Sequence, residues 1–179
     1  MGVIAPNIRG RKTWGAQAPT ARPTYDDWDD NALTLVVHHT AGRVVSNLNE
    51  VKAELRGIQK SHMSGSRGEP FNDIGYNYLI DRLGRVWEGR GWGVRGAHTL
   101  SHNTNTIGIS FMGNYDLKKL NLAQRTAYYR LVRKLQRQGA SITSIKGHKE
   151  MPGQSTACPG RYPLPQLAWT NRRLLKSRS

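Results

Sequence analysis

The sequence predicts a single-domain α/β fold, in which a central mixed β-sheet is flanked by about three helices. Three features support this fold class. An apolar, β-branched run from Thr34 to Val37 ends in the pair His38-His39 and is typical of a buried strand. Residues 122–138 repeat apolar side chains at helical spacing, and two short apolar segments flank Gly84 as in a β-hairpin. A chain of 179 residues is long enough for one well-formed core.

The first part of the chain is expected to be irregular. Residues 1–32 contain three prolines and a cluster of four aspartates between positions 26 and 30. We expect these residues to form an N-terminal arm that packs on the domain, with Trp14 as its anchor. Residues 33–179 then form the domain itself and end in a basic helix.

The next elements follow the strand that ends at His38-His39. A helix is expected from Asn47, which can cap it with Glu50 three positions on, to about His62. A hairpin joins residues 75–81 to residues 85–89, with Gly84 in its turn. Residues 89–105 are rich in glycine and are expected to form a long loop. Loops of this length in compact domains are usually functional.

The C-terminal third alternates strands with helices. A strand over residues 106–112 precedes the amphipathic helix 122–138, in which apolar side chains share one face and basic side chains share the opposite one. A short strand over residues 141–146 delivers His148 to a loop. This loop leads to a final helix over residues 165–176.

The formal net charge of +15 is concentrated near the C-terminal end. Residues 115–179 contain 14 lysines and arginines against two acidic residues, Asp116 and Glu150. Such a surface suggests a polyanionic partner, namely nucleic acid, anionic lipid, lipopolysaccharide or teichoic acid. A basic face that only keeps the protein in solution is the alternative, and charge alone does not choose between them.

The apolar segments bear on membranes and secretion. No run of about 18 apolar residues occurs, so no transmembrane segment is expected. The first ten residues lack the basic start and apolar core of a secretory signal. If the chain acts outside the cytoplasm, another factor is therefore expected to release it.

Side chains of types that commonly bind metals occur at three places in the chain: the pair His38-His39, His148 and Cys158. Successive strand residues point to opposite faces, so only one of His38 and His39 can serve a given site. His148 follows a strand, and Cys158 lies ten positions later in a loop with proline and glycine. As the single cysteine, Cys158 excludes an internal disulfide, and it is either a small buried apolar residue or a ligand. Two imidazoles and a thiolate suit zinc, although their spacing forms no close Cys-x-x-Cys or His-Glu-x-x-His pattern.

Several segments match, in order, the motifs of a known enzyme family. They are Trp14-Gly-Ala, Val37-His-His-Thr-Ala-Gly42, Asp73-Ile-Gly-Tyr-Asn-Tyr78, Val86-Trp-Glu-Gly-Arg-Gly-Trp92, Gly96-Ala-His98, Thr106-Ile-Gly-Ile-Ser-Phe-Met-Gly-Asn-Tyr115, Gly147-His148 and Thr156-Ala-Cys-Pro-Gly160. In these segments the chain resembles the type 2 N-acetylmuramoyl-L-alanine amidases, which are the zinc amidases of the peptidoglycan recognition protein and phage T7 lysozyme superfamily. The resemblance implies the amidase fold of the peptidoglycan recognition proteins.

The resemblance implies catalytic roles by position. One Zn²⁺ ion would be bound by the three family ligands, which fall on His38, His148 and Cys158. Tyr76 would be the catalytic tyrosine, although strand alternation by itself places Tyr78 on the same face and leaves both open. Thr156 would help to hold the substrate carbonyl.

The resemblance also implies substrate-binding residues. His98 and Asn103 fall in the muropeptide groove of the family. Trp92 is expected to line this groove. It is the last residue of the Gly-Arg-Gly-Trp motif, and in recognition proteins the residues that follow this motif help to distinguish lysine from diaminopimelate in the stem peptide. Arg95 could pair with the extra carboxylate of diaminopimelate. The sequence leaves the stem-peptide type open.

The loop before Cys158 departs from many members of the family. Nine residues separate His148 from Cys158, whereas many members have seven. Nine resembles the spacing of the bacterial cytosolic anhydromuropeptide amidases, whose last ligand is aspartate. The extra residues lie near Pro152-Gly153.

The resemblance predicts zinc-dependent hydrolysis of the amide bond between N-acetylmuramic acid and L-alanine in peptidoglycan. We expect a monomeric phage endolysin, released from the host cytoplasm by a holin and attracted to lipopolysaccharide or teichoic acid by its basic C-terminal third. The alternatives are a non-catalytic peptidoglycan receptor, which commonly lacks a zinc ligand, and a cytoplasmic amidase that recycles muropeptides. Nucleic acid is not expected as a partner, because no recognised binding motif accompanies the charge.

Overall fold

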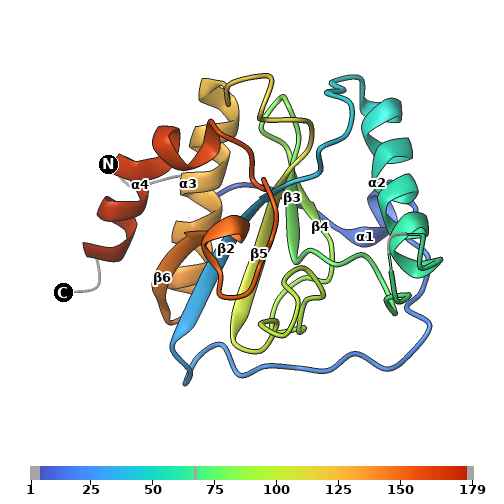
Figure 1. Ribbon diagram of the computed structural model, residues 1–179, viewed down its shortest axis with the longest axis horizontal. Coiled ribbons are helices and arrows are strands. Elements are labelled where there is room, and N and C mark those ends of the chain that lie inside the picture. Colours follow the sequence, from blue (N-terminus) through green and yellow to red (C-terminus); the bar gives the residue numbers. More distant parts are fainter. Residues whose placement is uncertain (1–4, 67, 177–179) are drawn as a thin grey trace.

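A six-stranded mixed sheet forms the centre of the protein (Figure 1). The computed structural model describes residues 5–66 and 68–176. The strands lie in the order β1-β4-β3-β5-β2-β6. Their bounds are Ile8–Arg9 for β1, Leu33–His39 for β2, Tyr78–Ile80 for β3, Val86–Glu88 for β4, Thr106–Phe111 for β5 and Ile142–Gly147 for β6.

Within the residues described, four α-helices cover the two faces of this sheet. They are α1 (Arg11–Trp14), α2 (Leu48–Met63), α3 (Leu122–Arg137) and α4 (Pro163–Lys176), and a short 3₁₀-helix, η1, spans His148–Glu150. The helices α1 and α2 lie on one side of the sheet, and α3 and α4 lie on the other (Figure 1). The predicted α/β fold with a central mixed sheet is therefore confirmed.

Strand β2 lies between β5 and β6, and both of these neighbours run parallel to it. Its side chains alternate between the two faces of the sheet. Leu33, Leu35 and Val37 join the core beneath α3 and α4. His38 therefore points to the opposite face, where α1 and α2 pack. Because β2 is buried on both faces, its sequence reads as a continuous apolar run.

Helices α2 and α3 begin where asparagine side chains cap them. The Asn47 side chain accepts hydrogen bonds from the backbone N–H groups of Asn49 and Glu50 at the start of α2, as expected. Asn121 and Gln124 form a capping box at the start of α3. The last helix starts at Pro163, two residues before the predicted start, since proline suits the first helical position.

The predicted irregular backbone of the N-terminal arm was wrong between Ile8 and Trp14. Ile8 and Arg9 add a parallel edge strand beside β4, and the short helix α1 follows. A strand of two residues is too short to show an alternation of apolar and polar side chains. Its pairing partner, β4, also lies far along the sequence. Trp14 is fully buried and donates from Nε1 to the carbonyl of Glu88 at 2.9 Å, so its predicted role as an anchor is confirmed.

Within residues 5–66 and 68–176, no helix combines the length and the apolar character that crossing a bilayer requires.

Candidate metal centre

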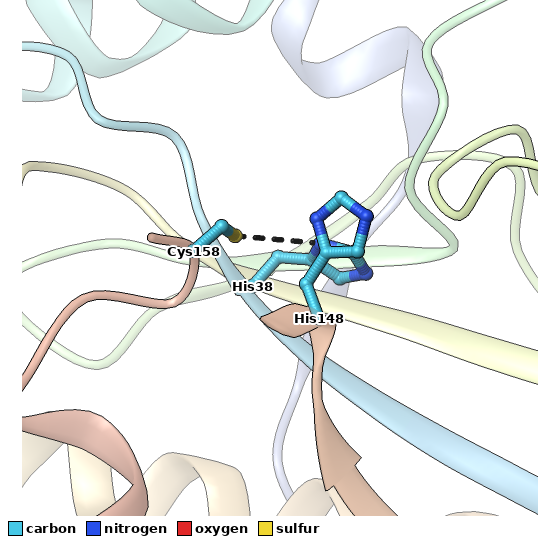
Figure 2. Close-up of side chains that lie close together, drawn as sticks. All are labelled: His38, His148 and Cys158. Carbon is cyan, nitrogen blue, oxygen red and sulfur yellow. Dashed lines mark hydrogen bonds between the residues drawn. The ribbon is translucent and has the colours of Figure 1, made fainter. Parts of the chain in front are cut away.

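His38 and His148 lie side by side because of the register between two parallel strands. Val37 of β2 pairs with Gly147 of β6, so the next residue on each strand emerges at the same edge of the sheet. Cys158 reaches this edge from the loop that precedes α4. One ligand atom from each of His38, His148 and Cys158 lies within 4.8 Å of the other two (Figure 2).

The three side chains are oriented by hydrogen-bonding partners. The Sγ atom of Cys158 lies 3.6 Å from Nδ1 of His38, and this contact is the dashed line in Figure 2. The same sulfur accepts from the backbone N–H of His39 at 3.4 Å. Nε2 of His148 lies 3.1 Å from Oε1 of Gln154, which leaves Nδ1 of that ring for a metal. Contacts within the protein thus orient each of the three candidate ligands.

Burial sets the protonation of these groups. It lowers the pKa of His38 well below its usual value, with the neighbouring His98 and His148 adding to the effect. Burial also lowers the pKa of His148, so both rings are neutral near pH 7. It raises the pKa of Cys158 to about 11, and the backbone hydrogen bond from His39 partly offsets this. Two neutral imidazoles and a thiol that can lose its proton are a donor set that fits zinc.

His39 lies on the other face of β2. Its Nδ1 accepts from the buried backbone N–H of Tyr115 at 3.1 Å. Its contacts with Cys158 come from its backbone. Of the two adjacent histidines, the structure therefore brings the ring of His38 to His148 and Cys158.

Tyr76 stands between two cavities next to this cluster. One cavity, of about 310 Å³, is also lined by His98 and His148, and the other, of about 220 Å³, is also lined by Glu54. The ring centroid of Tyr76 lies 5.3 Å from that of His38. The arrangement places the Tyr76 hydroxyl group, which belongs to the lining of both cavities, beside a candidate three-ligand metal site.

The expectation that Tyr76 and Tyr78 share a face was wrong. Tyr78 belongs to the core beneath α3 and α4, whereas Tyr76 packs against the core beneath α1 and α2. The reason is that β3 begins only at Tyr78, so strand alternation does not apply to Tyr76. Burial raises the pKa of Tyr78, with Glu88 adding to the effect, as expected for a phenol in a core.

Comparison with known proteins agrees with this geometry. Residues 29–161 match the family model described as N-acetylmuramoyl-L-alanine amidase. The chain belongs to this amidase family. It is 38% identical to peptidoglycan-recognition protein SC2 of Drosophila melanogaster over 160 residues, which are 88% of this chain and 83% of the relative.

Solved structures show the same relationship for the fold. The structure of Drosophila peptidoglycan recognition protein SA superposes with a TM-score of 0.83 at 30% identity, covering 93% of this chain and 94% of that one. Peptidoglycan recognition protein LE, solved with tracheal cytotoxin, a monomeric peptidoglycan of the diaminopimelic acid type, gives a TM-score of 0.81 at 28% identity over 90% of this chain and 93% of that one. The predicted amidase fold of the peptidoglycan recognition proteins is thereby confirmed.

Asn77 fixes the backbone that carries Tyr76 in this amidase-family protein. Its buried amide donates to the carbonyl of Val94 at 2.7 Å and to that of Gly91 at 3.2 Å. Its Oδ1 accepts from the N–H of Gly108 in β5 at 2.9 Å. One buried side chain thus joins the Tyr76 segment, the long loop and the sheet.

Thr156 is exposed in the loop before the cysteine. Its Oγ1 accepts from the backbone N–H of Cys158 at 3.1 Å. This contact shapes the turn that presents the thiol, and it leaves the hydroxyl proton of Thr156 available to a ligand.

His98 and Asn103 both line the 310 Å³ cavity. Oδ1 of Asn103 accepts from the backbone N–H groups of His98 and Thr99 at 2.8 and 2.9 Å. His98 is buried, and its Nδ1 lies 3.0 Å from Nε2 of His38. Burial lowers the pKa of His98 to about 3, with His148 and then Arg90 adding to the effect.

Trp92 and Arg95 lie elsewhere in this amidase-family protein. Trp92 packs edge-on against Trp28, with ring centroids 5.0 Å apart. Arg95 forms an ion pair with the buried Asp26, with Nη2 to Oδ1 at 2.7 Å. Neither residue lines the two cavities beside Tyr76. Their role in binding substrate stays a prediction.

His62 lines both cavities, a position that the sequence analysis, which placed it only near the end of a helix, did not predict. Nδ1 of His62 accepts from the N–H of Gly75 at 2.9 Å, and its ring lies 5.6 Å from that of Tyr76. A signal for this position was present, because His62 continues the inward stripe of Leu55 and Ile58 at helical spacing.

Proposed function

We propose that this protein is a zinc-dependent amidase that cleaves the bond between N-acetylmuramic acid and L-alanine in peptidoglycan. The convergence of His38, His148 and Cys158 within 4.8 Å carries the proposal. Membership in a family named for this activity supports the reaction. The complex of protein LE with a peptidoglycan fragment supports the class of substrate.

The chemistry follows from the donor set and the residues around it. When bound by two histidines and a cysteine, zinc supplies a polarising charge and a bound water with a pKa of about 7. Tyr76 would donate its hydroxyl proton to the oxygen of the tetrahedral intermediate, and the loss of one such donor typically costs about 10²–10³ in rate. Thr156 would donate a second, weaker hydrogen bond. Neutral His38 and His148 offer the lone pairs that ligation needs.

A turbidity assay on purified cell walls tests this function. We expect lysis by the zinc-loaded protein, loss of lysis on chelation, and recovery when zinc is restored. Lysis that persists after complete metal removal would refute the zinc mechanism. Binding of walls by the zinc-loaded protein without release of L-alanine N-termini would instead support the non-catalytic receptor.

The nine-residue spacing before Cys158 is the observation that favours a muropeptide-recycling amidase as the second candidate. The two enzymes differ in the substrate that they prefer. A comparison of kcat/KM on intact walls and on soluble anhydromuropeptides distinguishes them, because a recycling enzyme would prefer the soluble fragments.

A groove in the basic C-terminal region supports the proposal of a second binding partner. A groove of about 420 Å³ between α3 and α4 is lined by Tyr129 and Trp169 together with Arg125 and Arg173. Trp169 is 63% exposed, and the guanidinium of Arg173 lies 5.4 Å from its ring centroid. We propose that this groove binds anionic envelope polymers such as lipopolysaccharide, and that the protein acts as an endolysin after holin-type release. Co-expression with and without a holin tests the release.

A further inference from the structure

The two ring nitrogens of His38 face two different neighbours. Nδ1 lies 3.6 Å from Sγ of Cys158, on the side of the candidate metal site. Nε2 lies 3.0 Å from Nδ1 of His98, which is on the opposite side of the ring. The rings of His38 and His98 meet edge to face, with centroids 4.9 Å apart and an interplanar angle of 73°.

A hydrogen bond between two ring nitrogens needs one donor and one acceptor. If Nδ1 of His38 gives its lone pair to a metal, the single proton of that neutral ring lies on Nε2. That proton can then be donated only to Nδ1 of His98, which must be unprotonated to accept it. The geometry therefore couples the tautomers of the two rings.

The surroundings of His98 suit this tautomer. With Nδ1 accepting, the proton of neutral His98 lies on Nε2, 3.4 Å from Oγ1 of Thr106. That hydroxyl has carbonyl acceptors of its own, those of His102 at 3.1 Å and Asn103 at 2.9 Å. Its oxygen is thus able to accept from His98. A second hydroxyl, that of Thr99, lies 2.9 Å from Nδ1 of His98, so a proton that it donates there shares the single lone pair of this nitrogen with the proton on Nε2 of His38.

Two glycines make room for the His98 ring. A Cβ atom at Gly96 or at Gly108 would overlap Cδ2 of His98. Gly108 lies inside strand β5, where glycine is less favourable than alanine. A glycine inside a strand often marks a close approach, which here is that of the imidazole. The ring is thereby confined against the sheet beside His38.

We propose that His98 is a positioning residue that holds His38 in the tautomer and ring orientation required for a metal at Nδ1. This inference rests on the proposed zinc site. It differs from the substrate-groove role expected from the sequence, because it acts through His38 on the metal. Such outer partners of ligating histidines typically contribute about 10–100-fold to metal affinity.

The test measures zinc affinity by competition with a chromophoric chelator, in wild type and in two variants at His98. His98→Leu removes the acceptor, and we expect its zinc dissociation constant to rise about 10–100-fold. His98→Asn keeps an acceptor oxygen near the position of Nδ1, and we expect it to recover most of the affinity. The visible spectrum of the Co²⁺-loaded protein should change in His98→Leu and return toward that of wild type in His98→Asn.

A direct readout is available by NMR. In the zinc-loaded wild type, ¹⁵N spectra of the histidine rings should show the proton of His38 on Nε2 and a coupling through the hydrogen bond to Nδ1 of His98. A His38 proton on Nδ1 would overturn the inference. So would equal zinc affinity in wild type and His98→Leu with loss of wall binding alone, since that result indicates a substrate-binding role.

If His98→Leu does not fold, Gly108→Ala provides a second route. The added methyl group displaces the His98 ring without altering a ligand, so zinc affinity should again fall. Unchanged affinity in a folded Gly108→Ala protein would contradict the proposal. A wild-type protein that binds no zinc would refute the proposed function itself, which separates the two failures.

Discussion

Val37 of β2 pairs in register with Gly147 of β6, although 110 positions separate them in the sequence. This pairing makes His38 and His148 neighbours at the end of two parallel strands. The candidate metal centre therefore depends on the register of the sheet. A slip of one residue in β2 would move every side chain of the strand to the opposite face.

The two adjacent histidines of β2 give a matched pair of variants. We expect His38→Leu to lose zinc, because it removes a ligand. We expect His39→Leu to keep one zinc ion per chain and to lose about 1–3 kcal/mol of unfolding free energy, because the buried N–H of Tyr115 loses its acceptor. Metal analysis and chemical denaturation measure the two effects. The opposite outcome, with zinc lost only in the His39 variant, would show that the register assigned to β2 is wrong.

Zinc affinity should depend on pH through the thiol of Cys158. Near pH 7 the lowered pKa values of His38 and His148 leave both rings neutral, whereas a pKa of about 11 keeps the thiol protonated. Binding then releases one proton, so affinity should rise about tenfold for each pH unit from about 6.5 to 8.

The control for this slope is Cys158→Asp, which supplies a carboxylate that is already ionised in the same pH range. Its zinc affinity should be nearly independent of pH. Competition titrations at several pH values measure both proteins. A slope that survives in Cys158→Asp would mean that another group releases the proton.

Tyr76 and Tyr78 form a second matched pair. Tyr76→Phe should lower kcat by about 10²–10³ while zinc and wall binding persist, because the variant lacks only the hydroxyl donor. Tyr78→Phe should change kcat little, since Tyr78 lies in the core beneath α3 and α4. Measurement of amide cleavage with zinc content determined in parallel tests the pair. Equal kcat losses in both variants would count against a catalytic role for Tyr76.

Secondary-structure elements that are determined by neighbouring residues were predictable from the sequence. The apolar run of β2, the cap at Asn47 and the amphipathic face of α3 each depend on neighbours in the chain, and each was predicted correctly. Strand β1 was missed because Ile8 pairs with Val86, a partner that no local pattern reveals.

The site was predictable in its residue types and less so in its contacts. The resemblance to a known family predicted His38, His148 and Cys158 as metal ligands, and the fold brings these three residues together. The contact of His98 with His38 depends on the space left by Gly96 and Gly108, and the groove position of His62 depends on how α2 packs. Such relationships arise only after the chain has folded.

The groove between α3 and α4 gives the last prediction. Because Trp169 and Arg173 line this groove, Trp169→Ala combined with Arg173→Gln should weaken binding to lipopolysaccharide and killing of intact cells. Hydrolysis of isolated walls should stay within about twofold, since neither residue lines the cavities beside Tyr76. The matched control, Lys12→Gln, removes one positive charge as well, at an exposed residue of the N-terminal arm, and should retain binding. Added salt should reduce the difference between the two proteins, because screening weakens attraction between exposed charges. If the control loses as much binding as the groove variant, net charge rather than this groove attracts the envelope.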